Sequence, residues 1–250
     1  MPKTQKFTLI TGALGQLGQA ISKKLKDRGD YVIGWDISPK PKKLKFFDEY
    51  ERVDIRNEKK ICQAFKKIIK QHGQCDILIN NAGVSVFEPF EERSETSFDF
   101  VMDINLKGTF FCTKAYVKFF DLIRQKKGSI VNIASMYGII SPDPRIYTDC
   151  ARKNSEVYGA TKAGVIQMSR YFSVHLADRG IRVNCVSPGG VFNDRNPQGK
   201  DFVNNYSHRC PLKRMANDHE IASPVVWLSG DEASYVQGHN LVVDGGMSCW

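Results

Sequence analysis

The chain has 250 residues, 42% of them hydrophobic and 25% charged, which is ordinary for a globular protein that folds as one domain over residues 1–250. Its formal net charge of +9 comes largely from scattered lysines without a recognised nucleic-acid motif, so we predict solvated surface charge and no nucleic-acid partner. Seven cysteines without a Cys-x-x-Cys pair, no long apolar window and a polar start of the chain exclude a disulfide framework and predict a cytoplasmic protein without a membrane partner.

Short apolar runs alternate with longer amphipathic runs along the chain. The short runs predict strands at Phe7–Thr11, Tyr31–Trp35, Arg52–Ile55, Asp76–Asn80, Ser129–Ser135, Arg182–Ser187 and Leu241–Val243. The amphipathic runs predict helices at Gly15–Arg28, Glu58–Gln71, Ser97–Arg124, Glu156–Arg179 and His219–Leu228. This alternation predicts a parallel sheet covered by helices on both faces.

A glycine-rich turn follows the first predicted strand and opens the first predicted helix. Gly12, Gly15 and Gly18 allow a tight turn and a close approach of the backbone to a pyrophosphate. The free N–H groups at the start of a helix favour the negative charge of that group. Asp36, at the end of the second predicted strand, follows at the distance expected of a carboxylate that binds the adenosine ribose hydroxyls. The turn and the acid together predict a dinucleotide site.

Further motifs appear in a fixed order along the chain. They are Asn80-Asn-Ala-Gly83, Ile104-Asn105-Leu106, Ser135, Tyr158-Gly-Ala-Thr-Lys162, Pro188-Gly189 and Asp244-Gly-Gly246. With these motifs the chain resembles the short-chain dehydrogenase/reductase family, compact branch, over nearly its whole length. The resemblance implies a single-domain Rossmann fold of the α/β class, with a doubly wound parallel sheet of about seven strands.

The resemblance also implies the residues of the site. The catalytic residues are Asn105, Ser135, Tyr158 and Lys162. The cofactor residues are Gly12, Gly15, Gln16, Leu17, Gly18, Asp36, Asp54, Ile55, Asn81, Ala82, Gly83, Tyr158, Lys162, Pro188, Gly189 and Val191. Asp36 favours NAD over NADP, because a carboxylate repels a 2′-phosphate and the next residues are uncharged. The family's usual assembly through its two long helices implies a homodimer or homotetramer.

Two positions depart from the family pattern. Gln16 stands where the compact branch has a glycine, so the glycine spacing is closer to that of the extended branch. Asn193 stands where a threonine of the family reaches the nicotinamide amide, and asparagine offers a similar hydrogen bond.

The predicted chemistry is hydride transfer coupled to proton transfer. Tyr158 and Lys162 are four residues apart on a predicted helix and share one face, so we expect the ammonium to lower the pKa of the tyrosine. Ser135 is placed to hydrogen-bond the substrate carbonyl. The resemblance implies that Asn105 anchors a water between Lys162 and solvent. The histidines show no metal-ligand spacing, and no metal is predicted.

The substrate is predicted from an insert at residues 141–155 and a lid region at residues 190–216. The insert lengthens the gap between Ser135 and Tyr158 and carries Arg145 and Tyr147, while Arg195 lies in the lid region. These three residues are our candidate substrate contacts. Arginine binds a phosphate or carboxylate with two parallel hydrogen bonds, and the alternative for Arg145 is an ion pair with Asp143 or Asp149 within the insert. The amino-acid sequence of the insert resembles that of a subgroup of this family that is linked to bacterial surface-polysaccharide or flagellin-glycan sugar synthesis.

Three functions are compatible with these residues. The first is a dehydrogenase or reductase of a sugar or sugar phosphate, with an anionic sugar favoured by the charged insert. The second is a 3-oxoacyl-carrier-protein reductase, whose acidic partner would suit the +9 charge. The third is a non-catalytic dinucleotide-binding regulator, against which the intact catalytic set argues.

Overall fold

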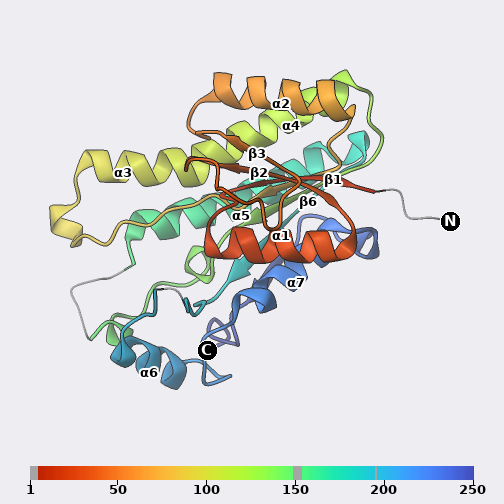
Figure 1. Cartoon of the computed structure of the whole chain (residues 1–250). Helices are drawn as coiled ribbons and strands as arrows, with labels where there is room; N and C mark the ends of the chain where they lie inside the picture. The colour runs from red at the N-terminus through yellow and green to blue at the C-terminus, as the bar shows by residue number, and fades with distance from the viewer. Residues whose placement is uncertain (1–4, 149–153, 195) are drawn as a thin grey trace.

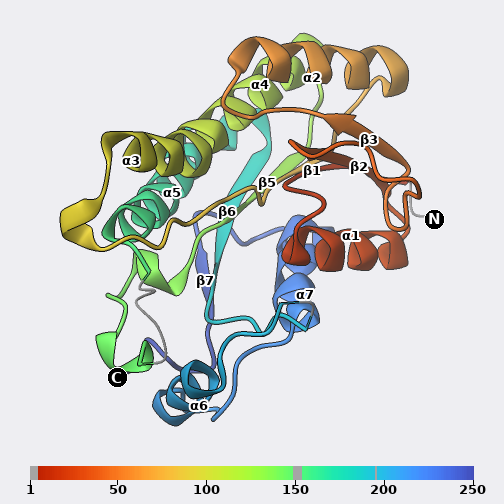
Figure 2. The same cartoon turned by 60° about the vertical axis from the view of Figure 1, so that its left-hand side comes forward.

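A parallel sheet runs through the centre of the computed structural model, which describes residues 5–148, 154–194 and 196–250 (Figures 1 and 2). Its strands are β1 (Phe7–Thr11), β2 (Tyr31–Asp36), β3 (Glu49–Arg52), β4 (Ile77–Asn80), β5 (Gly128–Ile133), β6 (Ile181–Pro188) and β7 (Asn240–Val243). They lie in the order β3-β2-β1-β4-β5-β6-β7, and all neighbours pair in parallel. The predicted α/β Rossmann fold is confirmed.

Helices cover both faces of this sheet. They are α1 (Gln16–Arg28), α2 (Glu58–His72), α3 (Glu95–Met102), α4 (Thr109–Leu122), α5 (Glu156–His175), α6 (Lys200–Arg209) and α7 (Asp218–Ser229). Figure 1 shows α1 and α7 below the sheet and α2 and α4 above it. The predicted single helix Ser97–Arg124 comprises α3, a π-helical segment at Asp103–Gly108 and α4, so it is interrupted where the catalytic candidate Asn105 lies.

The core is divided between the two faces because successive side chains of a strand point to opposite sides. On β1, Leu9 packs with the cluster under α2 and α4, and Ile10 packs with the cluster under α1 and α7. On β4, Leu78 and Ile79 divide in the same way. Strands buried on both faces are therefore nearly continuous apolar runs, which is why the sequence located them well.

The third strand lies at Glu49–Arg52, so the prediction of a strand at Arg52–Ile55 was wrong in position. The apolar residues that suggested the later range, Val53 and Ile55, are buried, but they lie beyond the end of the strand. The strand itself is at the edge of the sheet, and its charged side chains remain partly exposed. The buried apolar residues of this segment are therefore not the residues that pair with β2 in the sheet.

Helix α6 was not predicted, because only Phe202 and Tyr206 on it are buried and most of the rest of the segment is polar. These two aromatic residues pack with Ile146 and Tyr147 from the insert, in a small cluster separate from the two faces of the sheet. The helix and the insert thereby form a wall beyond the carboxyl ends of β5 and β6 (Figure 2). In open α/β sheets, ligands bind at this carboxyl edge, where the strand order reverses between β1 and β4.

Candidate active site

The turn between β1 and α1 brings backbone segments closer together than side chains would allow. Gly12 has a φ of +62°, and a Cβ atom there would lie 2.7 Å from the Cα atom of Ala82. A Cβ atom on Gly18 would lie 2.2 Å from the carbonyl oxygen of Gly12. Both positions therefore need glycine. No side chain caps the start of α1, so its first N–H groups suit an anion.

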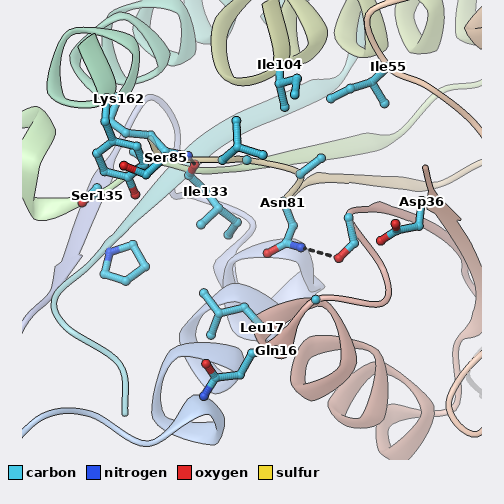
Figure 3. A pocket seen from close by; sticks show the side chains of 18 of the residues that line it. Gln16, Leu17, Asp36, Ile55, Asn81, Ser85, Ile104, Ile133, Ser135 and Lys162 are labelled. Carbon is cyan, nitrogen blue, oxygen red and sulfur yellow. Dashed lines mark hydrogen bonds between the residues drawn. The ribbon is translucent and has the colours of Figure 1, made fainter. Parts of the chain in front are cut away.

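Gln16, the departure from the family spacing, makes a long-range contact. Its Nε2 donates a hydrogen bond of 2.6 Å to the carbonyl oxygen of Phe192, in the loop after β6. Figure 3 shows Gln16 and Leu17 extending from the start of α1 toward the cavity. The side chain thus joins the glycine turn to the lid region, a role that glycine could not fill.

Asp36 and Asn81 line the same cavity as the glycine turn. The carboxylate of Asp36 accepts hydrogen bonds of 3.0 Å from the backbone N–H groups of Leu14 and Ser38. The amide of Asn81 donates to the carbonyl oxygens of Thr11 and Gly12, both at 3.0 Å. Figure 3 marks one hydrogen bond of this amide with a dashed line. Asn81 therefore ties the end of β4 to the glycine turn.

These residues enclose a cavity of about 550 Å³ at the carboxyl edge of the sheet. All the predicted cofactor residues line it except Gly18, which packs behind the turn against Gly12. Trp35, Val53 and Ile104 also line it and were not predicted. They are apolar residues at element ends, and the sequence gives no signal that separates them from ordinary core residues.

Tyr158 and Ser135 meet at one end of this cavity. The Tyr158 backbone N–H is fixed at the start of α5 by the Oγ of Ser155, at 3.1 Å. Burial raises the pKa of Tyr158, while a hydrogen bond to the Ser135 side chain acts in the opposite direction. Ser135 Oγ also accepts a hydrogen bond of 3.1 Å from the backbone of Tyr137. The serine hydroxyl is thereby aimed at the tyrosine hydroxyl.

Lys162 is buried and lies one helical turn beyond Tyr158. Its Nζ donates a hydrogen bond of 2.9 Å to the carbonyl oxygen of Ile133 and lies 5.6 Å from the centre of the Tyr158 ring. Burial lowers the pKa of Lys162 to about 8. The expectation that Lys162 lowers the pKa of Tyr158 is not met in this arrangement, since burial of the phenol dominates.

Asn105 lies in the π-helical segment and does not line the cavity itself, but it binds residues that do. Its Oδ1 accepts from the Val84 N–H at 2.8 Å, and its Nδ2 donates to the Val84 carbonyl at 2.9 Å and to Thr161 Oγ1 at 3.1 Å. It therefore fixes the chain after Gly83, where a Cβ atom would lie only 3.2 Å from Lys162 Nζ. The predicted water at Asn105 stays a prediction.

A second cavity, of about 200 Å³, adjoins the first at Ser135 and Tyr158. The predicted substrate residue Tyr147 lines it. Its other side chains, which the sequence analysis did not single out, include Phe87, Tyr137, Asn154, Gln198, Phe202 and Tyr206. Of these residues, only Phe202 and Tyr206 could have been linked from the sequence, because residues four apart share one face of a helix.

The structure does not bring Arg145 to the reacting groups, which corrects its assignment as a substrate contact. Its guanidinium pairs with Asp143, two residues away, with Nη2 at 2.7 Å from Oδ2, and its side chain is 83% exposed. It lines a separate cavity with Arg209 and Trp250. Arg145 binds Asp143 and not a substrate because this carboxylate is only two residues away and accepts two hydrogen bonds from the guanidinium. Arg195 lies outside the described residues, as do residues 149–153 of the insert.

Within the described ranges, no group of three or more His, Cys, Asp or Glu side chains could hold a metal ion. In the same ranges, no helix is long and apolar enough to cross a membrane.

The burial of Lys162 predicts that this residue costs stability. At pH 7 the folded state disfavours its charge, since its pKa is about 8 against an ordinary 10.5. We expect Lys162→Met to raise the stability of the ligand-free protein by about 1–3 kcal/mol, and Tm by about 2–4 °C per kcal/mol. Scanning calorimetry measures the change, and the same variant should lose activity.

The pH dependence supplies the control for this prediction. The unfavourable charge is fully present below pH 8 and disappears as the pH rises toward 10.5, where the unfolded state also loses its proton. The difference in Tm between Lys162→Met and the wild type should therefore shrink over that window. A lower Tm for the variant at pH 7 would contradict the assignment.

Comparisons with known proteins extend over nearly the whole chain. A family model described as "Enoyl-(Acyl carrier protein) reductase" matches residues 12–248. The chain is 32% identical over 255 residues to the 3-oxoacyl-[acyl-carrier-protein] reductase FabG of Thermotoga maritima, with 97% of each chain covered.

Two solved structures are similar as well. A short chain dehydrogenase from Leptospira borgpetersenii with bound NAD+ is 38% identical, with a TM-score of 0.90 over 98% of this chain and 93% of that one. The aldohexose dehydrogenase of Thermoplasma acidophilum is 27% identical, with a TM-score of 0.84 over 98% and 95% of the two chains. With the ordered motifs and the geometry around Ser135, Tyr158 and Lys162, these matches establish that the chain belongs to the short-chain dehydrogenase/reductase family of oxidoreductases.

Proposed function

We propose that this protein is an NAD-dependent oxidoreductase that interconverts a secondary alcohol and a ketone on a small sugar. The observation that carries the proposal is the meeting of two cavities at Ser135 and Tyr158. One cavity extends from there to Asp36 and suits a dinucleotide, and the other has the size of a small molecule. A proton-transfer pair at their junction is placed to act on a carbon between cofactor and substrate.

The residues around the larger cavity fit a nicotinamide dinucleotide. A Cβ atom at Gly12 or Gly18 would collide with the backbone of the turn, and the uncapped start of α1 offers N–H groups to a pyrophosphate. Asp36 is held by two backbone N–H groups with its carboxylate at the adenosine end. When bound, the nicotinamide accepts or supplies the hydride.

The chain's own residues handle the proton and the oxygen of the substrate. In the oxidation direction, Tyr158 takes the hydroxyl proton while the carbon gives up its hydride, and in reduction both return. Ser135 donates a hydrogen bond to the substrate oxygen as charge develops there. Lys162 would hold the nicotinamide ribose with its ammonium when the cofactor is bound, and so fix the cofactor beside Tyr158.

A sugar substrate is supported by the smaller cavity and by one relative. The tyrosine, asparagine and glutamine side chains that line the cavity suit hydroxyl groups, and its aromatic rings suit the C–H faces of a sugar. The similar Thermoplasma protein is an aldohexose dehydrogenase. The position of Arg145 removes the main argument for a phosphate or carboxylate at the reacting end.

A 3-oxoacyl-carrier-protein reductase is the second candidate, favoured by the 32% identity to the Thermotoga protein. The two candidates separate in one assay. A panel of neutral sugars, phosphorylated sugars, nucleotide sugars and acyl thioesters, scored for the nicotinamide absorbance change, should respond to sugars. A response confined to acyl thioesters would replace the first candidate with the second. A non-catalytic regulator would respond to none of them.

Assembly is proposed through α4 and α5, the long helices on one face of the sheet. Their exposed apolar side chains include Phe110, Tyr171 and Val174, which are 39%, 56% and 72% exposed. Phe110 lies 6.3 Å from Phe172 between ring centres, so the two helices present one continuous surface. Phe119 and Phe120 of α4 do not contribute to this surface, because they face the sheet and are buried in the core.

The proton-transfer role predicts the behaviour of Tyr158→Phe. This change keeps the ring and its packing but removes the transferable proton. We expect turnover to fall by about 100-fold or more, with NADH binding nearly unchanged. Tyr235→Phe is the matched control, since Tyr235 is fully exposed. Retention of more than about a third of wild-type activity by Tyr158→Phe would falsify the assignment.

Cofactor choice is predicted from Asp36 and its strand neighbour. We expect NADH to bind at least tenfold tighter than NADPH, about 1.4 kcal/mol or more. Arg52 pairs with Asp36 in the sheet register, and its Nε donates to the Ile37 carbonyl at 2.7 Å. Asp36→Ala should therefore weaken NADH and strengthen NADPH, because the arginine then meets the 2′-phosphate without a competing carboxylate.

Fluorescence titration of both nucleotides measures this switch, and the double variant Asp36→Ala/Arg52→Ala is its control. Removal of the guanidinium should cancel the gain in NADPH affinity. Comparable affinities of the wild type for the two nucleotides would sink the prediction.

Assembly predicts a mass above that of the monomer in light scattering at micromolar concentration. Val174→Glu should lower that mass, because it buries a charge in the contact. Gln63→Glu adds the same single negative charge to an exposed site on α2 and should leave the mass unchanged. A monomeric wild type, or equal dissociation by both variants, decides against the proposed interface.

A further inference from the structure

Asn154 occupies a position shared by the cofactor cavity and the substrate cavity. It lines both of them, as Ser135 and Tyr158 do. It comes from the end of the insert, four residues before Tyr158, where the chain enters α5. A substrate group bound between Ser135 and the cofactor would therefore lie beside the Asn154 side chain.

The amide of Asn154 is oriented by Ser85. The hydroxyl of Ser85 donates a hydrogen bond of 2.9 Å to Oδ1 of Asn154. This contact directs the Nδ2 group away from Ser85, and Nδ2 has no hydrogen-bond partner among the described residues. A half-buried amide with one end fixed and two N–H donors remaining suits an oxygen acceptor in the cavity.

The backbone next to Ser85 is held by the catalytic candidate Asn105. The neighbouring residue Val84 has both its N–H and its carbonyl bound by the side chain of Asn105, at 2.8 and 2.9 Å. The buried Asn105 thus fixes the backbone that carries Ser85, and Ser85 fixes Asn154. This chain of contacts gives the amide a defined position relative to Tyr158 and Lys162, as a preorganised binding group requires.

The position of Asn154 indicates which substrate atom it contacts. Ser135 and Tyr158 together hold the reacting oxygen, so a neighbouring donor that shares their cavity faces the substituent on the next carbon. We propose that Asn154 determines specificity by binding the hydroxyl group on the carbon beside the reacting one, so that the enzyme prefers vicinal diols and α-hydroxy ketones. This inference rests on the proposed function, whose substrate class it narrows.

The remaining walls agree with a compact, hydroxylated substrate. The cavity of about 200 Å³ is smaller than the roughly 300–1,000 Å³ of drug-sized pockets. Tyr137 and Tyr147 lie on its wall with their hydroxyl oxygens 3.1 Å apart. Burial raises the pKa of Tyr137, so this hydroxyl stays protonated and neutral. A substrate with oxygen on adjacent carbons meets polar groups on two sides and aromatic rings elsewhere.

The test compares two matched pairs of neutral probes. In reduction with NADH the pair is 2-hydroxycyclohexanone and cyclohexanone, and in oxidation with NAD it is 1,2-cyclohexanediol and cyclohexanol. The members of each pair differ by one hydroxyl group. We expect the wild type to prefer the hydroxylated member by about tenfold or more in kcat/KM, because a site built to bind a hydroxyl rejects the analogue without it.

Variants assign this preference to the amide. Asn154→Ala should lower kcat/KM for the hydroxylated probe at least tenfold more than for its partner, and Ser85→Ala should have a smaller effect in the same direction. Asn205→Ala is the control: Asn205 lies on α6, where its amide binds Thr148 Oγ1 at 2.8 Å, and it borders the separate cavity with Arg145. It should leave the ratio unchanged.

Two outcomes would overturn the inference. One is a wild type that does not distinguish the members of a pair, and the other is an Asn154→Ala variant that loses equally on both. Failure of the proposed function looks different: no carbonyl in the panel would then oxidise NADH. In that case quenching of NADH fluorescence by each probe gives the binding ratio for wild type and variants, and a ratio of one rejects the role of Asn154.

Discussion

The close approach of three backbone segments at the carboxyl edge of the sheet is the constraint on which the site depends. Gly12 lies against Ala82 so tightly that a Cβ atom would be 2.7 Å from its Cα, and Gly18 lies against Gly12 in the same way. The amide of Asn81 then bonds the carbonyls of Thr11 and Gly12. These contacts join β1, α1 and β4 at the point where the strand order reverses, so they position the groups that these elements bring to the larger cavity.

The proposed proton-transfer end of the site lowers the stability of the fold. Burial raises the pKa of Tyr158 and lowers that of Lys162 to about 8, so the interior favours the neutral form of each group. The chemistry needs the charged forms to be accessible, and the hydrogen bonds from Ser135 and to Ile133 offset only part of the cost. Of the two groups, only Lys162 is shifted toward neutral pH, and buried titratable groups with shifted pKa values are typical of enzyme active sites.

The substrate side is built differently from the cofactor side. Most of the cofactor residues lie at or just beyond the ends of strands in one sheet, where hydrogen bonds between strands fix the register of those strands. The proposed substrate cavity instead joins Tyr147 and Asn154 of the insert to Phe202 and Tyr206 of α6 and to the chain around Ser85. Side-chain packing and a few hydrogen bonds hold these segments, so the same frame accommodates different substrates when they change.

The sequence alone determined the sheet, the glycine turn, Asp36 and the order of the catalytic motifs, because apolar periodicity, glycine spacing and motif spacing are properties of neighbouring residues. It could not determine that α6 exists, that Asn154 borders both cavities, or that Arg145 turns to Asp143 instead of the substrate. Those outcomes depend on which distant segments pack together and on which of several partners lies nearest, and only the tertiary structure decides such competitions.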